Sequence, residues 1–207
     1  MSRADALYNK GLNYYNKKDY DNAVIVLTQA AEKKSTEAYH LLAYCYHYGL
    51  GTVQNIPKAI EWYEKAEKAG ISASTNNLGI IYRDGSGVPI NYEKAYNYFA
   101  KAHNKGNNFG TVNLGDCYKY GRYVSKNINR AVELYTEAAN KGMAYAQRTL
   151  GNLYYNGDGV AVNYQKAFEY YKKAADQGDN DSIYNLAQCI SMAGERLSII
   201  KEPLIYI

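Results

Sequence analysis

Long apolar segments and blocks of basic residues are both missing from this chain of 207 residues. No stretch approaches the roughly 20 apolar residues of a membrane span, and the opening segment, Met1 to Tyr8, holds no apolar core of a signal peptide. We therefore expect no membrane insertion and a cytoplasmic location, while export as an effector by another route stays open. The formal net charge of +4 is spread along the chain, which argues against nucleic acid as the partner.

Cysteine is scarce, and its spacing is regular. Cys45, Cys117 and Cys189 lie 72 residues apart. If they occupy equivalent positions in stacked helices about 10 Å apart, roughly 20 Å separates them, which is beyond the reach of a disulfide. We predict that they are small buried apolar residues in a protein kept in a reducing compartment.

Residue groups that perform catalysis or bind a metal are also missing. His40 and His47 lie seven residues apart, so a helix would separate them by about 10.5 Å along its axis. His103 completes no metal-ligand pattern with them, and no spacing joins a nucleophile to a histidine and a carboxylate. We expect no catalytic residue, no metal and no cofactor, and thus a protein that is not an enzyme.

Tyrosine, in contrast, is abundant, and the chain repeats itself. The 25 Tyr residues accompany only 3 Phe and 1 Trp, and a ring with a polar hydroxyl favours the half-buried positions that a thin array of helices offers. A strict period of 36 residues runs through the chain, which indicates internal structural repeats. The recurring columns are Leu42, Leu78, Leu114, Leu150 and Leu186; Ala43, Gly79, Gly115, Gly151 and Ala187; Tyr46, Tyr82, Tyr118 and Tyr154; Gly49, Gly85, Gly121 and Gly157; Asn55, Asn91, Asn127 and Asn163; Ala59, Ala95, Ala131 and Ala167; and Gly70, Gly106, Gly142 and Gly178.

Each repeat is predicted to be a helix (the A helix), a loop and a second helix (the B helix). Ala95, Tyr98, Phe99 and Ala102 have the i, i+3, i+4, i+7 spacing of an amphipathic helix. The small residues after the leucine allow neighbouring helices to approach closely. The asparagine column suits the N-cap of each B helix, and the closing glycine suits a left-handed position at its end. Period-2 alternation is absent, so the fold is predicted to be all-α.

Pairs of loop glycines, such as Gly85 and Gly87, are not interpreted as phosphate-binding loops. They follow no strand, and they recur with the repeat as loop geometry would.

The first unit is shorter than the others: Gly11 and Ala23 are 12 residues apart, whereas Gly79 and Ala95 are 16 apart. This spacing is typical of a tetratricopeptide repeat, and the later units carry four extra loop residues.

The later units resemble a known family. Residues 150–175 read Leu-Gly-x-x-Tyr-x-x-Gly-x-Gly-Val and then Lys-Ala-x-x-Tyr-Tyr-x-Lys-Ala-Ala, which is similar to the Sel1-like repeat, a branch of the tetratricopeptide superfamily. The resemblance implies a right-handed α-solenoid of about five antiparallel helix pairs plus a terminal helix, with an adaptor or scaffold role. The expected divisions are a tetratricopeptide-like repeat at 1–35, four Sel1-like repeats at 36–178, and an incomplete repeat with an apolar tail at 179–207.

Some residues depart from the repeat pattern. Tyr123 replaces the second loop glycine, and Thr52 stands where valine is usual. The last repeat is expected to have an A helix only, at about 180–193, because Pro203 occupies its B-helix position. We interpret the apolar tail 197–207 as a cap on the last helix; a docking segment for a partner or a second copy, and a truncated chain, are the alternatives.

The resemblance also implies that the A helices line a concave face. By register, this face is rich in Tyr with Asn, Arg and His between them, and Tyr and Arg are common at interface hot spots. We predict a groove for an extended or helical peptide, with about half of the tyrosines packing only between helices. The predicted partner-binding residues are Tyr8, Tyr15, His40, Tyr44, His47, Tyr48, Asn76, Arg83, Asp116, Lys119, Tyr120, Tyr145, Arg148, Asn152, Tyr155 and Tyr184.

The predicted function is therefore a non-enzymatic scaffold or adaptor for a peptide or protein partner. One alternative is a protein that binds or hydrolyses β-lactams or cell-wall fragments, an activity linked to some members of the family that the chain resembles. Another is a structural element that self-associates through residues 197–207. The clamp for chaperone C-terminal carboxylates is not expected, because Tyr8, Leu12 and Leu41 stand at its Lys and Asn positions.

Overall fold

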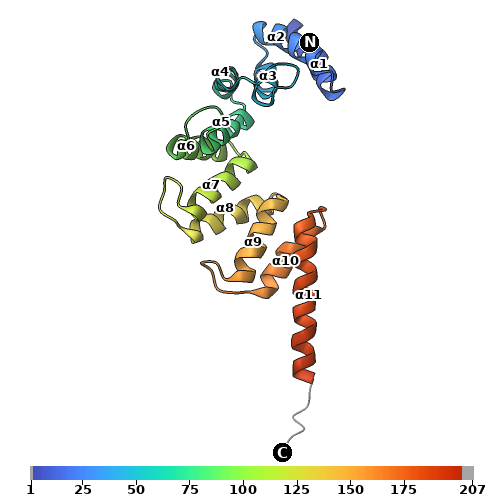
Figure 1. Ribbon diagram of the computed structural model, residues 1–207, viewed down its shortest axis with the longest axis vertical. Helices are drawn as coiled ribbons and strands as arrows, with labels where there is room; N and C mark the ends of the chain where they lie inside the picture. Colours follow the sequence, from blue (N-terminus) through green and yellow to red (C-terminus); the bar gives the residue numbers. More distant parts are fainter. Residues whose placement is uncertain (1, 202–207) are drawn as a thin grey trace, which may run out of the picture. The chain divides into compact units, whose positions relative to one another are not determined.

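The structure is a computed structural model that describes the backbone of residues 2–201 and the side chains of residues 2–190. This described part consists of helices joined by short connections, without a strand (Figure 1). The predicted all-α solenoid of helix pairs is thereby confirmed. The chain divides into two compact units, Met1–Leu114 (unit 1) and Gly115–Ile207 (unit 2), with the division inside helix α7.

Unit 1 contains three complete helix pairs and the start of a fourth. Unit 2 contains the end of α7, its B helix, one complete pair and a terminal A helix. The A helices are α1 (Arg3–Asn16), α3 (Thr36–Tyr48), α5 (Ser72–Asp84), α7 (Asn108–Tyr120), α9 (Ala144–Asn156) and α11 (Asn180–Lys201). The B helices are α2 (Tyr20–Glu32), α4 (Ile56–Lys68), α6 (Tyr92–Asn104), α8 (Ile128–Asn140) and α10 (Tyr164–Ala175).

The asparagine column caps the B helices as predicted. Asn55, Asn91, Asn127 and Asn163 precede α4, α6, α8 and α10, and each side-chain oxygen accepts from the backbone N–H three residues later at 2.9 Å. These bonds satisfy donors that a helix start otherwise leaves unpaired.

The connections within pairs also match the sequence. Residues 17–19 join α1 to α2, whereas residues 49–55 join α3 to α4, so the difference is the four extra residues expected. The closing position of the B helix takes a left-handed backbone, with φ of 96° at Gly70, and Lys34 adopts the same conformation in the first pair with φ of 65°. Tyr123, where a loop glycine was expected, is likewise left-handed, with φ of 70°.

Inside each pair, the small residue of the A helix faces a large side chain of the B helix. A Cβ atom added at Gly79 would lie 2.5 Å from the ring of Phe99, and one added at Gly151 would lie 2.6 Å from the ring of Tyr171. The predicted role of the small column in close helix approach is thus confirmed. The ring column that it serves was not identified from the sequence; it comprises Tyr63, Phe99, Tyr135 and Tyr171, all at most 2% exposed.

The terminal helix differs from its prediction. We expected an A helix ending near residue 193, but α11 runs from Asn180 to Lys201. Glu195, Arg196 and Leu197 are favourable helix formers, and the next proline along the chain is Pro203. Residues 202–207 and all side chains from residue 191 lie outside the described residues, so the roles predicted for the tail stay predictions.

Candidate functional site

In unit 1, the predicted face residues of α1 and α3 form a cluster of aromatic rings. The ring centroids of Tyr15 and Tyr44 are 6.4 Å apart, and those of Tyr44 and Tyr48 are 4.4 Å apart. His47 stacks on Tyr48 with centroids 4.3 Å apart. Tyr48 is 53% exposed, while Tyr8, Tyr15 and Tyr44 are half-buried. The rings therefore fill the space between the helices and leave mainly Tyr48 available to a partner.

The two histidines of α3 are held within this face. His40 Nδ1 lies 2.7 Å from the hydroxyl oxygen of Ser74, and burial lowers the pKa of His40. Burial also lowers the pKa of His47, against the opposing effect of the Asp84 carboxylate. Both imidazoles are therefore neutral near pH 7, and their contacts favour a structural role.

The remaining predicted residues of unit 1 belong to a polar chain that joins α5 to α7. Arg83 donates from Nη1 to the side-chain oxygen of Asn113 at 2.8 Å and from Nε to Asp84 at 2.6 Å. Asn113 in turn donates from Nδ2 to Asn76 at 2.8 Å. Asn76 is only 6% exposed, so the structure assigns it to contacts between helices.

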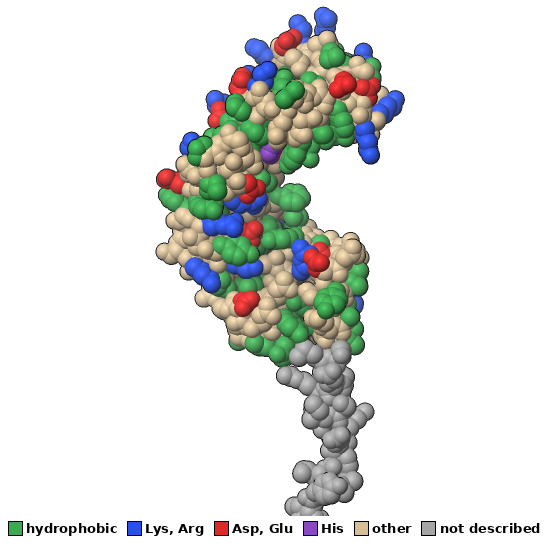
Figure 2. All heavy atoms as spheres, viewed as in Figure 1, with side chains coloured by type: hydrophobic (Ala, Val, Ile, Leu, Met, Phe, Trp, Pro, Cys, Tyr) green, Lys and Arg blue, Asp and Glu red, His purple; other side chains and the backbone are tan. Residues whose placement is uncertain are grey.

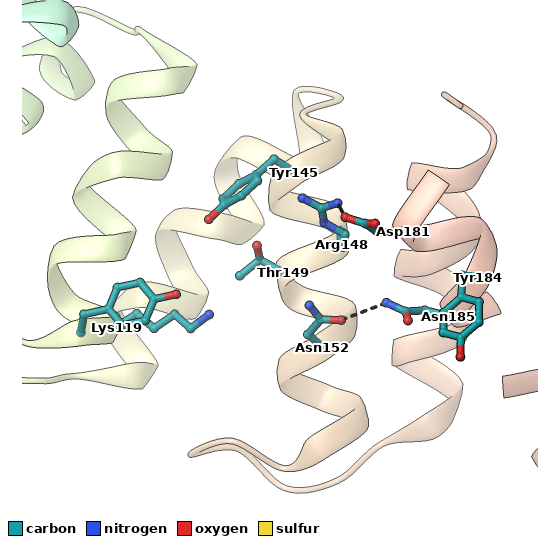
Figure 3. A pocket seen from close by; sticks show the side chains of 9 residues that line it. Lys119, Tyr145, Arg148, Thr149, Asn152, Asp181, Tyr184 and Asn185 are labelled. Atoms are coloured by element: carbon teal, nitrogen blue, oxygen red, sulfur yellow. Dashed lines mark hydrogen bonds and ion pairs between the residues drawn. The ribbon is translucent and has the colours of Figure 1, made fainter. Parts of the chain in front are cut away.

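Unit 2 presents an open cavity of about 500 Å³ on its A helices (Figure 3). Six of its nine lining residues were predicted from the sequence: Lys119, Tyr120, Tyr145, Arg148, Asn152 and Tyr184. The prediction missed Thr149, Asp181 and Asn185. Thr149 and Asn185 lie 36 residues apart and directly follow Arg148 and Tyr184, so the repeat register contained the signal that would have identified them.

The charges of this cavity are unequally paired. Arg148 donates to Asp181 and to Asp179, the latter at 3.5 Å, and its guanidinium carbon lies 5.6 Å from the ring centroid of Tyr145. Lys119 places its ammonium group 5.0 Å from the ring centroid of Tyr120. Among the described residues, no carboxylate forms an ion pair with Lys119, so its charge is available to a ligand.

Two predicted face residues anchor buried tyrosines of the B helices. Asp116 accepts a hydrogen bond from the Tyr135 hydroxyl at 2.5 Å, and Asn152 accepts one from the Tyr171 hydroxyl at 2.7 Å. Burial, followed by the charge of Asp116, raises the pKa of Tyr135. Because Asp116 and Asn152 are 36 residues apart, the repeat places the same polar contact in consecutive pairs.

A second cavity of about 330 Å³ adjoins the first. Its lining residues are Asn152, Tyr155, Asn156, Tyr171, Asn185 and Gln188. Asn152 and Asn185 line both cavities, and Asn185 Nδ2 donates to Asn152 Oδ1 at 3.3 Å. Tyr155, the last of the predicted residues, contacts the rings of Tyr164 and Tyr171 at centroid distances of 5.5 and 6.4 Å.

Two other kinds of site were considered within the described part of the chain: metal sites and membrane-spanning helices. It contains no group of three or more His, Cys, Asp or Glu residues suited to hold a metal ion. No helix in it combines the length and the apolar character needed to cross a membrane. Lys and Arg side chains on the visible face lie among Asp and Glu (Figure 2). Cys45 and Cys117 are buried as predicted, whereas Cys189 is half-buried.

The geometry agrees with comparisons to known proteins. The profile of the Sel1 repeat matches residues 36–71, 72–107, 110–143 and 144–179, so the chain belongs to the Sel1 repeat family. Proteins of this family are generally non-catalytic modules for protein–protein interaction. No curated protein matches the chain significantly.

Solved structures give the same fold. A Sel1 repeat protein from Oxalobacter formigenes is 29% identical with a TM-score of 0.83, and the match covers 90% of this chain and 78% of that one. A protective antigen of uropathogenic Escherichia coli that displays an SLR fold is 31% identical with a TM-score of 0.76. The match covers 89% of this chain but 40% of the antigen, so the chain spans less than half of that relative. An immunity protein from Pseudomonas aeruginosa is 26% identical with a TM-score of 0.61, covering 88% of this chain and 69% of that protein.

Proposed function

We propose that the chain is a non-enzymatic scaffold that holds a protein partner on the A-helix faces of its units. The observation that carries this proposal is the unit 2 cavity, whose walls come from three successive A helices, α7, α9 and α11. Such a surface binds several points of one partner at once. Tyr120, Tyr145 and Tyr184 are 52%, 40% and 65% exposed, and exposed tyrosine is enriched at binding hot spots.

Unit 1 contributes a second, more apolar contact surface to the proposed scaffold. Tyr48 leaves a large part of its ring exposed, and the neighbouring rings of Tyr44 and His47 hold it in place. A ring that is fixed before binding loses little conformational entropy when a partner covers it. This preorganisation supports an anchoring role for Tyr48.

The test compares the partners captured from a lysate of the native source by wild type and by a variant with Tyr44, Tyr48, Tyr120 and Tyr155 changed to Ala. A control variant carries Ile25→Ala and Tyr92→Ala, because these side chains are 57% and 41% exposed on B helices. Circular dichroism must first show that all three proteins are equally helical.

The scaffold proposal expects a partner, identified by mass spectrometry, that wild type and the control retain and the tyrosine variant loses. Equal capture by all three proteins would contradict binding on the A-helix faces. Loss in the control alone would place the interface on the B helices.

A further inference from the structure

The pair formed by Asn152 and Asn185 leaves one amino group and one carbonyl oxygen unused among the described residues. Asn152 uses its side-chain oxygen twice, accepting from the Tyr171 hydroxyl at 2.7 Å and from Asn185 Nδ2 at 3.3 Å. Among the described residues, no group accepts from Asn152 Nδ2 and none donates to Asn185 Oδ1. Figure 3 shows the Asn152 oxygen directed at Asn185 and its nitrogen directed away, into the space beside Thr149.

The Asn152–Asn185 pair is held in this orientation before any ligand arrives. Tyr171 is 2% exposed, so its hydroxyl has a fixed position, and its bond to Asn152 Oδ1 holds the Asn152 side chain in place. Asn185 is then oriented by its bond to Asn152. Because this ordering is already complete in the free protein, binding groups that match the pair loses little conformational entropy.

An N–H donor beside a C=O acceptor is the complement of a peptide unit, which offers one acceptor and one donor. The pair lines both cavities, of about 500 and 330 Å³. An extended segment places successive side chains on opposite sides of its backbone. A backbone that crosses the Asn152–Asn185 pair therefore passes beside both cavities, which have room for its neighbouring side chains.

The charge of the larger cavity selects among such segments. Arg148 is already paired with Asp179 and Asp181, whereas no described carboxylate pairs with Lys119. A partner's Asp or Glu side chain in this cavity would supply the missing counter-charge. It would form a charge-assisted bond that a neutral side chain lacks.

We propose that unit 2 recognises an extended peptide segment of its partner, with the Asn152–Asn185 pair bonding one backbone peptide unit and Lys119 bonding an adjacent acidic side chain. This inference rests on the proposed scaffold function and specifies the chemistry of the partner. Its central element is a hydrogen-bonded contact with the ligand's backbone, and a direct test must detect that contact.

The test starts from short linear random peptides displayed on phage and selected against the immobilised full chain. Selected peptides that protect α9 from hydrogen exchange are synthesised with a fluorescent label, and their affinity is measured by fluorescence anisotropy. Each backbone nitrogen is then methylated in turn. We expect one methylation to weaken binding to wild type roughly fivefold, the cost of one lost hydrogen bond, and to have no effect on binding to Asn185→Ala.

Asn152 requires a compensated variant, because removing it alone leaves the buried Tyr171 hydroxyl unpaired. The double variant Asn152→Ala, Tyr171→Phe removes both partners, and Tyr171→Phe alone is its matched control; Phe99 shows that the ring column accepts phenylalanine. The double variant should bind roughly fivefold more weakly than Tyr171→Phe. Asn140→Ala, exposed at the end of α8, should bind like wild type, and Lys119→Met should remove any preference for acidic peptides.

Two results would overturn the inference: no selected peptide protects α9, or every N-methylation has the same effect on wild type and Asn185→Ala. Either result leaves the scaffold proposal intact if the lysate experiment still finds a partner that depends on the tyrosines. If that partner is also absent, the scaffold proposal fails as well.

Discussion

The A-helix faces of units 1 and 2 use the same repeat positions and yet have opposite characters. Tyr44, Asp116 and Asn152 share one repeat column. In unit 1, the ring of Tyr44 lies against Tyr48 with centroids 4.4 Å apart and fills the surface. In unit 2, the shorter Asn152 leaves space, and an open cavity forms beside it. The comparison teaches that the register selects which positions face outward, while side-chain size at those positions decides between a closed aromatic face and an open polar one.

The largest expected effect concerns the contact between the small residue of an A helix and the ring of the B helix that packs against it. Gly151→Val in unit 2 puts a Cβ atom 2.6 Å from the Tyr171 ring, and we expect a loss of about 2–3 kcal/mol in the free energy of unfolding from overpacking. In unit 1, the equivalent Ala43 already accommodates a Cβ atom, so Ala43→Gly should cost only about 1 kcal/mol. Denaturant unfolding measures both losses, with hydrogen exchange followed in α9 and α10 for Gly151→Val and in α3 and α4 for Ala43→Gly. Equal losses would contradict the difference between the pairs.

The next prediction compares two buried tyrosine hydroxyls, one bonded to a charged carboxylate and the other to a neutral amide. Tyr135 donates to the Asp116 carboxylate at 2.5 Å, whereas Tyr63 accepts from the Asn77 amide at 3.2 Å. We expect Tyr135→Phe to cost about 2 kcal/mol and Tyr63→Phe about 1 kcal/mol, because bonds to charged groups are stronger. Thermal unfolding of both variants tests the order, and a larger loss for Tyr63→Phe would reverse it.

The third prediction compares how the stability of the two units depends on pH. Burial alone would raise the pKa of Glu67, but Lys101 and Lys105 outweigh burial and hold that pKa below its usual range. The carboxylate therefore stabilises the folded state above the unfolded pKa, and this contribution is lost as pH falls through the folded pKa. Unit 2 has Ala139 in the same repeat column.

We therefore expect wild type to lose hydrogen-exchange protection in α4 and α6 as pH falls below 4.5. The Glu67→Gln variant should be less stable at pH 7 by about 1–2 kcal/mol and should lack this part of the acid response. Protection in α9 and α10 provides the internal control. An unchanged acid response in Glu67→Gln would show that other carboxylates cause it.

The smallest expected effect is a gain in stability. Tyr123 has a left-handed backbone with φ of 70°, and Gly87 has φ of 70° at the equivalent position in unit 1. Left-handed backbone costs a residue with a Cβ atom roughly 1 kcal/mol, so Tyr123→Gly should raise the free energy of unfolding by about that amount. The reverse change, Gly87→Ala, should lower it, because the added Cβ atom lies 2.7 Å from Ile56. A loss of stability in Tyr123→Gly would show that contacts of the ring outweigh the backbone strain.

Much of the fold followed from local signals. The Asn163 cap depends on a bond between residues three apart, and the close approach at Gly151 recurs because the repeat places the same small residue there. Most of the unit 2 cavity was also predictable, since Lys119, Arg148 and Tyr184 followed from the A-helix register. Asp181 was missed because no repeat column marks an aspartate at the start of one A helix as the ion-pair partner of a residue in the preceding A helix.

The sequence by itself determined the helices, their caps, their pairing and the positions that face outward, because each depends on neighbours along the chain or on a repeated spacing. Only the tertiary structure decided the character of each face. The closure of the rings around Tyr44, the pairing of Arg148 with Asp181 and the unused donor and acceptor of Asn152 and Asn185 depend on side chains from different helices. Packing selects their orientations, and the spacing of residues along one helix does not encode that choice.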